Sequence, residues 1–425
     1  MSNKKIFCNV PWTNTHVYWN GQFGMCCAES HPPADRTYNL KFHSVTDWYN
    51  SKPITDFRQR MLGNDPLSEC SNCYHDEKYG HESKRIRENF KTAIFTEQAF
   101  DRSYQESEWN EHFTPVTTQQ PRDWHVDFGN ECNLACKMCF PGASSRIAQQ
   151  HVKWGILESM PTNWTSDPVQ WQRFIDSVDS TKEIHRMHVM GGEPMINKRY
   201  VEFVQHLVDH GRTNISMSFV SNGTLINHDL IKLLKKFKEV NIEISLESIN
   251  DNNHYIRQGS NTAQVIDSVR WLGMNTFFQV VMRSVPQLLS VNNYDQYIQW
   301  AFDCKLSIQS IPIQRPAYMA INVLPWDIRA GLVEQYIRVK EYIESKTHSI
   351  KTIATGRDTG RLGSQLMREC DMIISQLQAP APSNVQALRS MLVEWLLRWD
   401  KIYDLDAREY YPEYTTFLEQ YGYRI

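Results

Sequence analysis

The sequence predicts an α/β fold: a partial (β/α)6, TIM-like barrel between a cysteine-rich amino-terminal module and a helical carboxy-terminal region. Between residues 123 and 325, short apolar runs alternate with helical patterns, which is typical of parallel βαβ units. Six such units leave the barrel incomplete, because a closed barrel of this type has eight. Most of the cysteines precede this segment or open it, and the pattern after Pro325 is helical.

The chain therefore divides into a cysteine-rich module (residues 1–105), a polar linker (106–122), the barrel (123–325) and a helical region (326–425). Thr114-Pro115 and Gln120-Pro121 mark the linker. The expected strands are 123–129, 186–191, 214–221, 240–247, 275–285 and 306–313. The expected helices include 198–211, 229–238 and 262–273 in the barrel, and 331–345, 363–377 and 384–403 after it.

Composition excludes several classes of function. The 425 residues carry 45 basic and 48 acidic side chains, a formal net charge of -3, which gives no electrostatic case for nucleic acid or anionic membrane as a partner. No run of about 18 apolar residues is present, so no transmembrane helix is expected. The first residues lack the apolar core of a signal peptide. We therefore expect a cytoplasmic protein whose cysteines bind metal instead of forming disulfides.

Three closely spaced cysteines follow the first predicted barrel strand. Cys132, Cys136 and Cys139 form a C-x3-C-x2-C motif. Three thiolates can hold three irons of a [4Fe-4S] cube and leave the fourth iron open to an amine and a carboxylate. The alternative is a zinc site completed by a distant ligand such as His125 or His188.

Polar or glycine-rich segments recur where the next three strands end. Gly191-Gly192-Glu193-Pro194 follows the second strand, Ser221-Asn222-Gly223 ends the third, and Ser245 and Glu247 lie on the fourth. Active sites of parallel barrels lie at the carboxyl ends of the strands, where the cysteine motif also lies. Alone, the glycine turn indicates only a tight strand-to-helix connection; together these features predict a binding site for a small ligand.

In this order the motifs resemble those of the radical S-adenosylmethionine (SAM) superfamily over residues 120–325. The resemblance implies that Cys132, Cys136 and Cys139 ligate a catalytic [4Fe-4S] cluster. It also implies that SAM contacts Met138, Gly191, Gly192, Glu193, Ser221, Asn222, Ser245, Glu247 and Arg257. Glu193 would accept the methionyl ammonium group. Arg257 would be a carboxylate partner, unless it is a surface arginine on a barrel helix. Met138 stands where the family usually has an aromatic residue, and its sulfur can pack against adenine.

The amino-terminal cysteines form a second group. Cys70 and Cys73 have the C-x2-C spacing of zinc and iron–sulfur sites, and Cys8 with Cys26 or Cys27 can complete four thiolates. This block resembles the auxiliary-cluster modules called SPASM and twitch domains, although those modules usually follow the barrel. Five cysteines support one auxiliary [4Fe-4S] cluster, which favours the shorter twitch type, and structural zinc is the alternative. We expect the single cysteines Cys304 and Cys370 to be buried.

The resemblance implies an enzyme that cleaves SAM to a 5′-deoxyadenosyl radical, with an electron donor such as flavodoxin or ferredoxin. A peptide or protein substrate is the first expectation. Oxidation of a small molecule is the second, and an iron–sulfur scaffold or redox sensor without catalysis is the third. Arg283, on the fifth predicted strand, is expected to meet either a substrate carboxylate or Glu243 or Glu247. The sequence identifies no catalytic side chain and no oligomeric state.

Overall fold

The computed structural model describes residues 6–29, 37–78, 80, 82–95, 113–117, 120–349 and 359–424. The chain forms two compact units, each built from several stretches: residues up to 133, 140–220 and 226–241 in the first, and 134–139, 221–225 and 242–425 in the second. Most of residues 106–122, the expected linker, lie outside the described parts. Residues 114 and 115, which are described, accept hydrogen bonds from Trp12 (2.6 Å) and Arg58 (3.1 Å) through their carbonyl groups. In the described residues, no helix is long and apolar enough to cross a membrane.

The first unit is organised around a mostly parallel sheet. Strand β1 (Asn14–Val17) pairs with the antiparallel β2 (Phe23–Gly24) and with the parallel β3 (Asp123–Asp127). Strand β5 (Arg186–Met190) continues the sheet to β6 (Ser216–Ser221). The strands predicted near 123, 186 and 214 are therefore confirmed. β1 and β2 were not predicted, because their segment is short and its residues do not alternate between apolar and polar.

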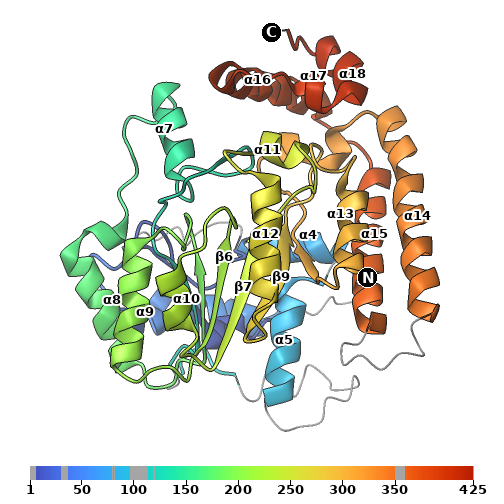
Figure 1. Cartoon of the computed structure of the whole chain (residues 1–425). Helices are drawn as coiled ribbons and strands as arrows, with labels where there is room; N and C mark the ends of the chain where they lie inside the picture. The colour runs from blue at the N-terminus through green and yellow to red at the C-terminus, as the bar shows by residue number, and fades with distance from the viewer. Residues whose placement is uncertain are drawn as a thin grey trace. The chain divides into compact units, whose positions relative to one another are not determined.

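Helices cover one face of this sheet (Figure 1). Alternate residues of β3 point toward them: Trp124 is fully buried, and its ring contacts Phe174 of α8 at 6.1 Å between centroids. The helices of the unit are α1 (Val10–Thr13), α2 (Val45–Tyr49), α3 (Lys52–Leu62), α4 (Ser71–Lys78), α5 (Lys84–Phe95), α7 (Ser145–Lys153), α8 (Pro168–Ser180), α9 (Lys198–Asp209) and α10 (His228–Leu234), with 3-10 turns η1 (Ser68–Cys70) and η2 (Trp164–Ser166).

Side-chain caps explain where several of these helices begin. The Asp167 carboxylate accepts from the backbone N–H groups of Val169 and Gln170 at the start of α8, and Asn197 accepts from Tyr200 at the start of α9. Ser44 and Asp47 form a reciprocal capping box at α2. Ser44, Asp167 and Asn197 each occupy the N-cap position, so they fix the residue at which the helix begins.

Of the described residues, the second unit contains the remaining strands and the carboxy-terminal helices. Strand β7 (Glu239–Ser245) begins in the first unit and ends in the second. Strands β9 (Phe278–Ser284) and β10 (Ile308–Ser310) pair in parallel, and the short β4 (Ala135–Cys136) and β8 (Arg257–Gln258) pair antiparallel. The helices are α11 (Asn252–Ile256), α12 (Thr262–Gly273), α13 (Tyr294–Asp303), α14 (Trp326–Ser349), α15 (Thr359–Gln378), α16 (Val385–Tyr403), α17 (Ala407–Tyr410) and α18 (Thr415–Gln420), with 3-10 turns η3 (Ala317–Met319), η4 (Ile321–Val323) and η6 (Pro412–Tyr414).

The predicted α/β class and the helical carboxy-terminal region are confirmed. Helix α12 has the predicted bounds, whereas α14 and α15 extend beyond theirs and run side by side (Figure 1). One prediction about the cysteines is wrong. Cys370 is buried in α15, but Cys304 is exposed, because it is the residue that caps the end of α13.

Candidate functional site

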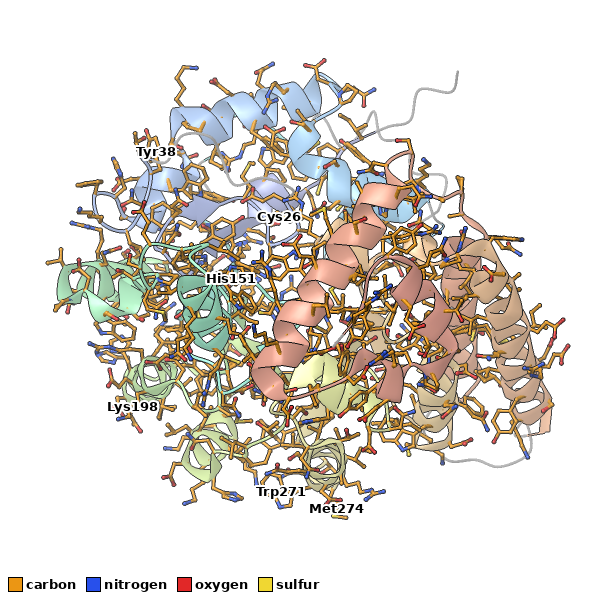
Figure 2. The ribbon with its side chains drawn as sticks, turned by 90° about the horizontal axis from the view of Figure 1, so that it is seen from above. Cys26, Tyr38, His151, Lys198, Trp271 and Met274 are labelled. Carbon is orange, nitrogen blue, oxygen red and sulfur yellow. The ribbon has the colours of Figure 1, made fainter. Side chains whose placement is uncertain are left out.

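Four of the five amino-terminal cysteines line one cavity in the first unit. Cys8 precedes α1, Cys26 follows β2, Cys70 ends η1, and Cys73 lies one turn further along, in α4. Residues three apart on a helix share a face, so the Cys70 and Cys73 side chains enter the cavity together. The other lining residues are Val10, Pro11, Met25, Ala28, Glu29, Phe57, Met61, Glu69, Lys84 and Arg85. Figure 2 labels Cys26 among the surrounding side chains.

The fifth cysteine, Cys27, does not line this cavity. The neighbouring Cys26 thiol lowers the pKa of Cys27 most, and His125 and Lys84 act in the same direction. Burial raises the pKa of the Cys70 thiol to about 12 and also raises the pKa of Cys8. A metal or cluster bound by these thiols must therefore displace protons from them. In the described part of the chain, no three His, Cys, Asp or Glu side chains are arranged to hold a single metal ion.

Two consecutive cations reach the cavity from the start of α5. Lys84 is 9% exposed, and its ammonium lies 3.3 Å from His125 Nε2 and 3.7 Å from a Glu88 carboxylate oxygen. The guanidinium of Arg85 donates to the Phe7 carbonyl oxygen at 3.2 Å and to Glu77. The walls therefore combine thiols with positive charge, which suits an anionic iron–sulfur cluster.

The sheet face opposite α8 carries a row of polar side chains, called here the polar row: His16, His125, His188 and Ser218. They lie at one register on β1, β3, β5 and β6. His188 Nδ1 lies 2.7 Å from the Ser218 hydroxyl. Burial alone would lower the pKa of His16, but the Asp127 carboxylate, 3.3 Å from its Nε2, raises that pKa above its ordinary value. Both histidines suggested as zinc ligands therefore have other partners.

The glycine turn adopts a conformation that side chains would prevent. Gly191 and Gly192 have φ values of +77° and +62°, in the region that favours glycine. A Cβ on Gly192 would lie 2.3 Å from the Glu131 carbonyl oxygen. The backbone N–H of Glu193 donates to that same oxygen at 2.7 Å. The turn is therefore packed directly against the loop that leads to Cys132.

Glu193 is the carboxylate of this turn and is 1% exposed. Its Oε1 accepts from the backbone N–H of Met195 at 2.9 Å, which fixes the side chain in place. The backbone of Cys132 is fixed by Ser145, whose hydroxyl accepts from the Cys132 N–H at 3.2 Å. The first unit thus brings four of the predicted site residues together: Cys132, Gly191, Gly192 and Glu193.

The second unit holds the rest of the predicted site around the loop of Cys136 and Cys139. Arg257 lies opposite Cys136 in the β4–β8 pair, and its Nη1 donates to the Cys136 sulfur at 3.5 Å. Its Nε and Nη2 donate to Glu247 Oε1 at 3.2 and 3.1 Å. Arg257 has a side chain only 11% exposed, so the alternative of a surface arginine is wrong.

Burial and hydrogen bonds fix the remaining predicted residues. Glu247 is fully buried, and its Oε2 accepts from the Val285 N–H at 2.8 Å. Ser221 and Asn222 accept from the backbone N–H groups of Gly223 and Thr224, which shapes the end of β6. Ser245 is buried at the end of β7, and Met138 is half-buried.

Sequence reasoning missed three groups that the structure places beside these sites: Lys84, the His16–Asp127 pair and Lys137. Burial lowers the pKa of Lys137, between Cys136 and Cys139, to about 8. A signal for the second group was present in Asp123-Trp-His125-Val-Asp127, where polar residues alternate with apolar ones along a strand. No local sequence pattern indicated a role for Lys84, because the side chains around it in space come from other segments of the chain.

Two family models match the chain. The model of the radical SAM superfamily matches residues 126–286, and the model of the SPASM iron–sulfur cluster-binding domain matches residues 8–74. The chain therefore carries a radical SAM domain and a SPASM-type module. The radical SAM domain implies a [4Fe-4S] cluster and SAM as cofactors, and the SPASM domain implies auxiliary iron–sulfur binding. Of the two module types considered from the sequence, the match is thus to SPASM.

One curated relative and two solved structures accompany these matches. The radical SAM cyclopropyl synthase TigE of Paramaledivibacter caminithermalis is 26% identical over 283 residues, which are 64% of this chain and 53% of the relative. The chain thus matches about half the length of that relative. Structures of Streptococcus suis SuiB, bound to S-adenosylmethionine or to its precursor peptide SuiA, are 13% identical, with TM-scores of 0.34 and 0.37. They cover 69% and 70% of this chain and 62% and 63% of SuiB.

Proposed function

We propose that this enzyme reductively cleaves SAM to methionine and a 5′-deoxyadenosyl radical, which takes a hydrogen atom from a peptide or protein substrate. The observation that carries the first part is the C-x3-C-x2-C motif inside the segment matched by the radical SAM model. A cluster held by Cys132, Cys136 and Cys139 would supply one electron to SAM. That electron would come from an external donor such as flavodoxin or ferredoxin.

The predicted binding residues have distinct tasks in this proposal. The two glycines allow SAM to approach the backbone, and the Glu193 carboxylate accepts from the methionyl ammonium. Ser221, Asn222 and Ser245 offer hydroxyl and amide groups to the ribose and the carboxylate of SAM. Arg257 is oriented by Glu247, and its guanidinium has further N–H donors for the SAM carboxylate.

An auxiliary [4Fe-4S] cluster is proposed for the cavity of Cys8, Cys26, Cys70 and Cys73. Four thiolates are the usual ligand set of such a cluster, and this cavity offers four. Cys27 is assigned a different role, because it does not line the cavity. Structural zinc is the competing occupant, and metal analysis distinguishes the two.

Family members with such modules modify ribosomal peptides and proteins or oxidise small molecules, so a peptide or protein is the first proposed substrate and oxidation of a small molecule is the second candidate. To separate the two, the reconstituted enzyme is incubated with SAM and synthetic peptides encoded by short reading frames beside its gene. Loss of two hydrogens from a peptide, detected by mass spectrometry, supports the first. Unchanged peptides together with oxidation of a metabolite made by neighbouring genes support the second.

The SAM chemistry is tested without a substrate. Anaerobically reconstituted protein, reduced with dithionite and given SAM, is expected to release 5′-deoxyadenosine. A variant with Cys132, Cys136 and Cys139 all replaced by Ala removes the three cluster ligands and should abolish this release. Release from that variant at the wild-type rate would refute the assignment.

A further inference from the structure

A buried lysine lies between two of the proposed ligands of the catalytic cluster. Lys137 is 1% exposed, although it occupies a loop of the C-x3-C-x2-C motif. Its ammonium donates to the carbonyl oxygen of Tyr255 at 2.8 Å and lies 3.8 Å from the centre of the Tyr255 ring. Its backbone N–H donates to the Ile256 carbonyl oxygen at 2.9 Å. The side chain therefore holds the cluster loop against the segment 255–258 of the same unit.

A buried ammonium group needs a compensating negative charge, since an unpaired charge in a protein interior is costly. The carboxylate that attracts Lys137 is Asp400 of α16, which is also 1% exposed. Asp400 accepts from the Tyr255 hydroxyl at 2.9 Å, from the Tyr423 hydroxyl, and from the Ala407 N–H at 3.1 Å. Tyr255 thus contacts Lys137 through its carbonyl group and Asp400 through its hydroxyl.

Other contacts tie the same carboxy-terminal segment to this place. Asn252, three residues before Tyr255, donates through Nδ2 to the Tyr410 carbonyl oxygen at 3.1 Å. The ring of Tyr255 packs against that of Tyr410 in a tilted arrangement, at 4.6 Å between centroids, and the centre of the Trp399 ring lies 5.5 Å from the Lys137 ammonium. Helices α16, α17 and α18 gather in this part of the second unit (Figure 1). Neither family model extends to them.

We infer that Lys137, Tyr255 and Asp400 form a charge-balanced clamp by which the segment 385–424 fixes the loop of the catalytic cluster. The inference rests on the proposed function, because it takes Cys136 and Cys139 to be cluster ligands. The carboxy-terminal helices are then part of the structure that supports the SAM-cleaving site. All three residues are positioning residues, and none of them is required to touch SAM.

The charges of Lys137 and Asp400 should affect the reduction potential of the catalytic cluster, whereas a role in packing alone would not. A cationic ammonium near the cluster favours its reduced, more negative state, and an anionic carboxylate opposes it. Lys137→Met should therefore shift the reduction potential of the catalytic cluster to lower values, and Asp400→Asn should shift it to higher values. In Lys137→Met/Asp400→Asn both charges are absent, so the potential should return toward that of the wild type.

The experiment has one arm without clusters and one with them. In the apo protein, each single variant should lower the melting temperature, and the double variant should lose less than the sum of the two losses. Lys401→Met and Asp404→Asn are matched controls, because both residues are exposed near the end of the same helix. Tyr255→Phe removes only the hydroxyl that donates to Asp400. It replaces a charge variant that does not fold. It should lower the melting temperature and iron retention.

In the reconstituted protein, the potential is measured by a redox titration followed by electron paramagnetic resonance. Shifts of the two single variants in opposite directions support the clamp. Equal shifts, no shifts, or additive losses in the apo protein would overturn it. Failure of the proposed function looks different: the wild type would then retain no catalytic iron and release no 5′-deoxyadenosine, while the coupling in the apo protein would persist.

Discussion

The ammonium of Lys84 lies 3.3 Å from Nε2 of His125, and both side chains are buried. The ammonium can only donate, so His125 accepts with Nε2 and carries its own proton on Nδ1. Lys84 also lines the cavity of the four cysteines, while His125 belongs to the polar row. A single buried cation of the first unit thus connects the proposed auxiliary-cluster site with the polar face of the sheet.

Replacing Lys84 tests this connection. In Lys84→Met the stem keeps its volume and the positive charge beside the cavity is lost. We expect the reduction potential of the auxiliary cluster to fall, because the reduced cluster loses a stabilising cation. Redox titration of protein that also carries the Cys132, Cys136 and Cys139 to Ala changes isolates the auxiliary signal. Lys52→Met, at a side chain 80% exposed, is the control that should leave the potential unchanged.

Iron content distinguishes Cys26 from Cys27. With both clusters present we expect about eight irons per chain, and about four in the variant that lacks the catalytic ligands. In that background, Cys27→Ser should keep about four irons and Cys26→Ser should lose most of them, since only Cys26 lines the cavity. Iron loss caused by Cys27→Ser alone would reverse the assignment. Stoichiometric zinc without charge-transfer absorption would identify a structural zinc site.

The barrel could be predicted from the sequence because its strands are apolar runs with clear helical neighbours. The SPASM-type module could be predicted only from its cysteine spacing, since β1 and β2, with four and two residues, are too short to show a periodic pattern. The choice between Cys26 and Cys27 depends on which way each side chain points, which no spacing reveals. Likewise, Lys137 and Asp400 are 263 positions apart, and only the packing of α16 brings them together.

Arg283 is expected to be a structural residue of the second unit. Its Nη1 lies 3.5 Å from Glu243 and 3.3 Å from the Gln309 side-chain oxygen, so of the two predicted partners the structure favours the carboxylate of the neighbouring strand. The pair is partly exposed, at 22% and 13%, which limits its value to about 1 kcal/mol or less. Arg283→Lys should therefore lower the melting temperature slightly and leave 5′-deoxyadenosine release unchanged. A normal melting temperature with impaired product formation would instead indicate contact with substrate.

Glu193 provides a test of SAM binding that keeps the local structure. In Glu193→Gln the side-chain oxygen can still accept from the Met195 N–H, so the turn and the iron content should persist. The negative charge is lost, and a hydrogen bond to an ionised partner contributes about 1.5–3 kcal/mol, so SAM affinity should fall about tenfold or more. Equilibrium dialysis with labelled SAM measures the affinity, and iron analysis of the same sample controls for cluster loss. Glu202→Gln, at an exposed site on α9, is the matched control. If Glu193→Gln binds SAM as the wild type does, the glycine turn shapes the backbone only, and another group must receive the methionyl ammonium.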